Sequence, residues 1–339
     1  MCQSCNILPT ATEAAQLNRR RMLGVGAAAG LAGAAALTVG AGTAGAATGG
    51  GPGARPGNHG QRRVPVDNIS IQLYTLAALL AKDVDGTLEG LADIGFKKVE
   101  HAGVPAGLTP RQFRAKLDHH GLRSTSGHNT PPTVPFDAAT WSRTLDDAHT
   151  LGQTYINQSV VGVTGFSATG IQYLQTKAQW QELAGVLNRA GRMARDTGLK
   201  FGLHNHFWEF LPLTDTPLVG SDILIAELDP RYVHFEIDIF WAHYGHHDPV
   251  QLVSYLQDRV PQFHVKDMKL LNGAPAPSPL LSTFTWTDPG TGIIDFRRVF
   301  AAMSASPRTT EYIIERDDAG AAALTTARVG FNFLKNIRF

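Results

Sequence analysis

The sequence predicts an α/β fold, a single (β/α)8 TIM barrel. Eight short apolar runs alternate with segments that carry apolar residues at helical spacing, as repeated strand–helix units do. A glycine stands shortly before four of these runs, where the preceding helix is expected to end. No GxGxxG follows the first run, and eight runs favour a closed barrel over the alternative, a doubly wound open sheet. The predicted strands are 69–74, 96–100, 122–126, 155–160, 200–204, 233–238, 262–266 and 311–315.

Capping signals indicate where the intervening helices begin. Thr109 and Asp248 each stand directly before a proline, so a capping side chain precedes a residue that readily starts a helix. The segment 270–291 breaks the alternation, since it is long and contains four prolines. We expect it to be a lid or a substrate-contacting loop. The expected helices are 109–120, 138–151, 177–197, one beginning at 248, 295–305 and 319–335.

The N-terminal segment does not fit the barrel pattern. Arg19, Arg20 and Arg21 precede an Ala/Gly-rich apolar stretch and a small-residue cleavage site, as in signal peptides. The arginines resemble those of the bacterial twin-arginine (Tat) export signal. We therefore expect a Tat-type signal peptide at 1–47 and a periplasmic or extracellular protein, the alternative being an uncleaved membrane anchor. The segment 48–65 is expected to be a flexible Gly/Pro/Arg linker, and 66–339 the barrel.

Composition narrows the classes of function. Lys and Arg total 30 against 29 for Asp and Glu, a net charge of +1, which argues against a nucleic-acid partner. The only cysteines, Cys2 and Cys5, lie in the expected signal peptide. The mature protein would then contain no disulfide, no cysteine-ligated zinc and no cysteine nucleophile. The sequence also lacks the GxSxG motif and a P-loop. The oligomeric state stays open, and a homo-oligomer is compatible with the sequence.

Four candidate metal ligands, His204, Asp238, His264 and Glu315, end the last four predicted strands. Strand ends meet at one rim of a barrel, so two imidazoles and two carboxylates are expected to form one site. A single acidic residue at a strand end is more often a helix cap or an ion-pair partner, but four in register favour a metal site. Mixed nitrogen and oxygen ligation suits Mn, Co, Zn, Fe or Ni better than Ca, and Mg also stays open.

Other polar and aromatic residues near the strand ends are candidates for catalysis or substrate binding. Glu315 is expected to double as a base, with His206, Glu209 or Lys266 as its acid partner. A hydrogen-bond network along the rim is the alternative role for the polar substrate-binding candidates, and a wall or core position is the alternative for Trp208. The candidates for substrate binding are Glu100, His128, Trp208, Trp241 and Asp317.

Over residues 66–339 the chain resembles the sugar phosphate isomerase/epimerase family of the xylose isomerase-like TIM-barrel superfamily. The motifs that carry the resemblance are QLYT at 72–75, VE at 99–100, HNH at 204–206 with EF at 209–210, FEIDIFW at 235–241, HVKDM at 264–268, GTG at 290–292 and IERD at 314–317.

The resemblance implies a divalent metal held by Glu, Asp, His and Glu at strands five to eight, with the two glutamates as an acid/base pair. This chain keeps Asp238, His264 and Glu315 but has His204 at strand five, where the glutamate is expected. It is therefore closer to a subgroup with His-Asn-His at strand five. Some relatives of that subgroup look like lyases or hydrolases of 3-keto-glycosides.

We accordingly expect a metal-dependent sugar isomerase or epimerase that removes a proton next to a carbonyl, with the metal stabilising the enediolate. Because sugar phosphates are scarce outside the cytoplasm, the substrate is expected to be a non-phosphorylated carbohydrate. The first alternative is a 3-keto-glycoside lyase or hydrolase acting by metal-assisted β-elimination. The second is a carbohydrate-binding barrel without catalytic activity, and endonuclease-like DNA repair is the weakest alternative.

Overall fold

The computed structural model describes residues 62–339, except 168–169, 272–283, 304–308 and 310. The predicted signal peptide, most of the predicted linker and the middle of the predicted lid therefore lie outside the described residues. Among the helices of the described part, none has the length and apolar character needed to cross a membrane.

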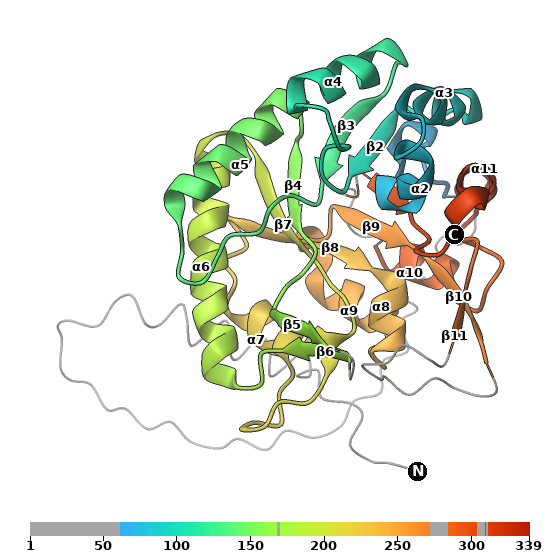
Figure 1. Ribbon diagram of the computed structural model, residues 1–339. Coiled ribbons are helices and arrows are strands. Elements are labelled where there is room, and N and C mark those ends of the chain that lie inside the picture. Colours follow the sequence, from blue (N-terminus) through green and yellow to red (C-terminus); the bar gives the residue numbers. More distant parts are fainter. Residues whose placement is uncertain (1–61, 168–169, 272–283, 304–308, 310) are drawn as a thin grey trace, which may run out of the picture. The chain divides into compact units, whose positions relative to one another are not determined.

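Eight parallel strands form the barrel (Figure 1). Six of them make one sheet in the order β1-β12-β9-β8-β7-β4, and β2 pairs with β3. Single bridges from Gln72 to Glu100 and from His128 to Asn157 join β2 to β1 and β3 to β4, which closes the circle. The prediction of a (β/α)8 barrel is confirmed. The barrel strands are β1 Ile69–Ile71, β2 Lys98–His101, β3 Arg123–Gly127, β4 Tyr155–Gln158, β7 Lys200–His204, β8 Val233–Asp238, β9 Gln262–Val265 and β12 Glu311–Ile314.

Helices surround the strands (Figure 1). The capping signals lie where the sequence places them. Thr109 accepts from the backbone of Gln112 in a capping box, and Asp248 accepts from Val250 N. Gly95 and Gly152 end their helices in the left-handed conformation. The helices are α2 Ala77–Leu80, α3 Val84–Ile94, α4 Pro110–His119, α5 Ala138–Leu151, α6 Lys177–Asp196, α7 Gly220–Glu227, α8 Ile239–Tyr244, α9 Pro249–Leu256, α10 Phe296–Ala302 and α11 Ala323–Asn336.

Short elements that the sequence analysis did not anticipate decorate the barrel. In the described residues, two are antiparallel hairpins and five are single turns of 3-10 helix. They are β5 Val163–Ser167, β6 Gly170–Tyr173, β10 Asp267–Leu270, β11 Phe284–Thr287, η1 Val66–Asn68, η2 Leu73–Leu76, η3 Trp208–Phe210, η4 Gln257–Arg259 and η6 Gly320–Ala322.

The hairpin β10–β11 is built from the two described ends of the predicted lid. Asp267 anchors its base, because Oδ2 accepts from Gly290 N at 3.0 Å and from Gly292 N at 2.8 Å. A Cβ atom at Gly292 would clash with the Asp267 carboxylate, so only glycine allows this approach. Trp286 of β11 stacks on Phe240 of α8, with 4.6 Å between the ring centroids. The described ends of the segment are thus ordered and pack at the C-terminal side of the barrel.

Candidate active site

Two carboxylates, Glu100 and Glu236, lie inside the barrel just below the strand ends, and neither is exposed to solvent. Glu100 accepts from Gln72 Nε2 at 2.8 Å and from Ser126 Oγ at 2.6 Å. Asn157 Nδ2 donates to Glu236 Oε1 at 2.8 Å. The donors lie on two strands, β3 and β4, and in the turn after β1, so they fix both carboxylates before any substrate arrives.

Gly202 of β7 makes room for this network. A Cβ atom there would clash with the side chains of Asn157 and His234. At the end of the same strand, Asn205 exchanges two hydrogen bonds with the Asp238 backbone, of 3.0 and 3.1 Å. The amide therefore continues the pairing of β7 with β8 and sets His204 beside Asp238. The sequence analysis did not identify this role for the asparagine of the His-Asn-His motif.

His204 and His264 lie between inner and outer carboxylates. The His264 Nε2 atom is 2.7 Å from Glu100 Oε2, and its Nδ1 atom is 2.8 Å from Glu315 Oε2. The His204 Nδ1 atom is 3.3 Å from Glu236 Oε2, and its Nε2 atom is 3.7 Å from Asp238 Oδ2. Each ring thus turns one nitrogen toward the barrel interior and the other toward the rim.

The structure brings the four predicted ligands together, with one donor atom of each within 4.8 Å of the others. We call His204, Asp238, His264 and Glu315 the outer group. A second set, His128, His204, Glu236 and His264, meets the same distance limit, and we call it the inner group. The sequence analysis missed Glu236 as a site residue. Its signal was the alternation of β8, which puts Glu236 on the same side of the strand as Asp238.

A divalent metal of the expected kind fits this chemistry. The donors are imidazole nitrogens and carboxylate oxygens, which suit first-row transition metals. Two of the atoms, Asp238 Oδ2 and His204 Nδ1, are buried without a hydrogen-bond partner. Buried polar atoms are rarely left unpaired, so a ligand at this place would satisfy them.

Lys266 is a buried cation at the rim of the outer group. Its Nζ atom is 2.9 Å from Glu315 Oε2, 2.9 Å from Asp317 Oδ1 and 3.5 Å from Asp238 Oδ2. It also lies 5.2 Å from the ring centroid of Trp241. Burial alone would lower the pKa of Lys266, but the three carboxylates raise it above its ordinary value. The side chain is therefore an ammonium at neutral pH.

The side chains of the outer group differ in their protonation. Burial raises the pKa of Asp238 to about 6. Burial would also raise the pKa of Glu315, but Lys266 and His264 together hold it below its ordinary value. Burial, helped by the neighbouring imidazoles, lowers the pKa of His204 well below its ordinary value. At neutral pH the rim therefore presents the carboxylates of Glu315 and Asp238, the ammonium of Lys266 and the neutral imidazole of His204.

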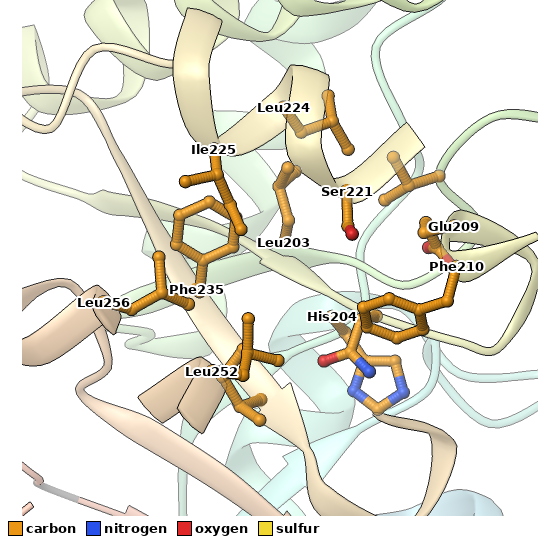
Figure 2. A pocket seen from close by; sticks show the side chains of 13 residues that line it. Leu203, His204, Glu209, Phe210, Ser221, Leu224, Ile225, Phe235, Leu252 and Leu256 are labelled. Atoms are coloured by element: carbon orange, nitrogen blue, oxygen red, sulfur yellow. The ribbon is translucent and has the colours of Figure 1, made fainter. Parts of the chain in front are cut away.

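Glu209 is not brought to this cluster. The chain leaves the strand after His204 and turns into η3, which carries Glu209. The carboxylate accepts from His206 N at 2.9 Å and lines an apolar cavity between β7–β8 and α7–α9 (Figure 2). Figure 2 shows it near Ser221 at one end of this cavity, whose other walls carry Leu224 and Leu252. Its predicted role as an acid/base partner has no geometric support.

The remaining predicted site residues lie either in the wall of the site or at its open rim. Glu100, predicted to bind substrate, is enclosed by the interior network instead. The ring of Trp208 packs flat on His206, with centroids 4.2 Å apart, and its Nε1 atom donates to Val161 O. Trp208 is therefore a wall residue. Trp241 is also buried, but its indole N–H has no hydrogen-bond partner, and it faces Lys266.

Asp317, His128 and His206 complete the rim. The side chains of Asp317 and His128 are 26% and 12% exposed, so both are accessible from the open end of the site. The ring of His206 lies 4.9 Å from that of His204, between the centroids. Burial and the nearby Lys266 lower the pKa of His206 well below its ordinary value.

The fold and this site define a (β/α)8 barrel with a metal-type cluster of imidazoles and carboxylates at the C-terminal rim. The chain belongs to the xylose isomerase-like TIM barrel family, whose model matches residues 88–337. The inosose dehydratase of Geobacillus kaustophilus (strain HTA426) is 25% identical over 276 residues, which cover 75% of this chain and 87% of that protein.

Two solved structures show the same fold. One is a sugar phosphate isomerase/epimerase from Parabacteroides distasonis ATCC 8503, with a TM-score of 0.64 and 20% identity over 80% of this chain and 94% of that one. The other is the IOLI protein with a bound zinc atom, with a TM-score of 0.59 and 13% identity over 79% of this chain and 97% of that one.

Proposed function

We propose that this protein is a metal-dependent carbon–oxygen lyase that acts on a keto-sugar or keto-cyclitol derivative. A C–H bond next to the carbonyl breaks, and its electrons form a C=C bond through an enolate. The C–O bond on the following carbon breaks, and the leaving oxygen takes up a proton as water or as an alcohol. No oxidant or reductant is consumed. The relation to a protein named inosose dehydratase supports this reaction class over the isomerase or epimerase expected first.

The observation that carries the proposal is the contact of 2.9 Å between Glu315 Oε2 and Lys266 Nζ. Glu315 takes the proton from carbon, and Lys266 gives a proton to the leaving oxygen. After product release, the proton passes from Glu315 to Lys266 across this contact, which restores both groups. A two-base epimerase needs a second base on the opposite face of the carbon, and the family resemblance implies a carboxylate in that role. The strand-five position expected to supply it is His204.

A divalent metal held by His204 and His264 with the carboxylates beside them would act as a Lewis acid on the carbonyl oxygen. The chain's own groups orient the substrate. Trp241 offers an unpaired indole N–H, and the Asp317 carboxylate accepts from a sugar hydroxyl at the open side. Export of the protein, as expected from residues 1–47, favours a non-phosphorylated substrate.

The test is product analysis with the metal-loaded protein and two substrates, a 3-keto-glycoside and an inosose. We expect an α,β-unsaturated ketone, followed by its ultraviolet absorbance, together with one equivalent of released alcohol or water. Glu315→Gln should abolish both signals because it removes the base. Formation of an epimer or an aldose–ketose isomer without loss of the leaving group would refute the lyase and restore the first expectation.

A further inference from the structure

The barrel interior holds two carboxylates, Glu100 and Glu236, that have no lysine or arginine partner among the described residues. Among the described residues, every ion-pair contact of Glu100 and Glu236 is to an imidazole of His128, His204 or His264. Buried charge needs a partner, and here the partners are imidazoles, whose nitrogens can bind a metal cation in place of a proton. The outer carboxylates differ, since Lys266 already lies beside them.

The donor atoms of the inner group have the spacing of metal ligands. Glu236 Oε2 lies 2.9 Å from His128 Nε2, 3.3 Å from His204 Nδ1 and 3.3 Å from His264 Nε2. Ligands about 2.0–2.1 Å from a tetrahedral zinc are about 3.3 Å from each other. All four donor atoms lie within 4.8 Å of one another, and three imidazoles with one carboxylate are a set of donors that suits Zn²⁺ or Co²⁺.

One atom of this group is unpaired. His204 Nδ1 is buried and has no hydrogen-bond partner, although Glu236 Oε2 lies 3.3 Å away. A bound cation would satisfy this nitrogen. On the two rings that both groups share, this cation would bind His204 Nδ1 and His264 Nε2. The other nitrogen of each ring faces Asp238 or Glu315.

We propose that the inner group of His128, His204, Glu236 and His264 is itself a binding position for a divalent transition metal, distinct from the outer group. Glu100, 2.7 Å from His264 Nε2, adds negative charge beside it. An ion in this position leaves Glu315 and Lys266 available for proton transfer. The inference shares two histidines with the proposed lyase site, but its test counts metal and not turnover, so the two can fail separately.

The test is metal stoichiometry and affinity of the full chain, by elemental analysis and by calorimetric titration with Co²⁺ and Zn²⁺. Glu236→Gln and His128→Ala each alter the inner group alone, whereas Asp238→Asn alters the outer group alone. We expect both inner variants to lose one ion per chain, or to bind at least 10-fold more weakly, and to lose visible absorbance of a tetrahedral Co²⁺ complex. Asp238→Asn should keep that absorbance.

His128→Ala guards against a folding artefact, since this ring lies at the partly open side of the group, and circular dichroism of the metal-free variants reports the fold. Wild-type stoichiometry and affinity in both folded inner variants would overturn the proposal. So would loss of the tetrahedral Co²⁺ spectrum in Asp238→Asn alone.

Discussion

The two sides of the His204–His264 pair hold carboxylates in different ways. On the inner side, Glu100 and Glu236 are fixed by amide, hydroxyl and imidazole groups and have no solvent exposure. On the outer side, Asp238 and Glu315 share the ammonium of Lys266. The two sides therefore suit different functions. The inner side holds fixed carboxylates that favour binding of a cation, and the outer side holds groups that can exchange protons.

The largest expected effect, on turnover, comes from removing the ammonium of Lys266. Lys266→Met keeps the length of the side chain but takes away the proton donor and the charge. We expect turnover to fall by about 10²–10⁴-fold, the usual contribution of a general acid. The measurement is kcat on the keto-glycoside substrate. Lys269→Met is the matched control, because Lys269 is exposed on the neighbouring strand β10. Near wild-type kcat in folded Lys266→Met protein would show that the outer side does not transfer protons.

A smaller effect, on stability, is expected from another buried carboxylate, at the opposite end of the barrel. Glu311, at the start of β12, is buried, and burial raises its pKa from 4.5 to about 7. Between these two values the unfolded chain releases the proton while the folded protein keeps it, so stability falls as pH rises. Below pH 4.5 both states are protonated, and the penalty is absent.

Glu311→Gln should remove this penalty. The stability difference between variant and wild type should grow from pH 4.5 to pH 8, by at most about 3 kcal/mol. Urea unfolding at several pH values measures it. Glu182→Gln, on the exposed face of α6, controls for the loss of a charge. A difference that stays constant with pH would show that this carboxylate is compensated in the folded state, as Glu315 is by Lys266 and His264.

Local signals explain how much of the fold was predictable. The caps at Thr109 and Asp248 and the stops at Gly95 and Gly152 act within a few residues, so the sequence shows them directly. The hairpin β10–β11 was missed because its pairing depends on Asp267 reaching backbone amides more than twenty residues away.

The site was predictable only where strand geometry decides it. The outer group followed from strand ends that meet at one rim. Alternation along β8 could have indicated Glu236 as a site residue. Its contact with His128 joins β8 to the end of β3, and no local sequence pattern reveals that contact. The position of Glu209 could not be predicted from strand geometry, because the chain turns after His204, where Asn205 takes over the pairing with β8.

The most direct test of the account is the metal content of the purified barrel domain, beside a His204→Ala, His264→Ala double variant. These two rings belong to both the inner and the outer group. We predict at least one transition-metal ion per wild-type chain and none in the folded double variant. A wild-type protein that binds no metal, even after incubation with Mn²⁺, Co²⁺ or Zn²⁺, would contradict the account.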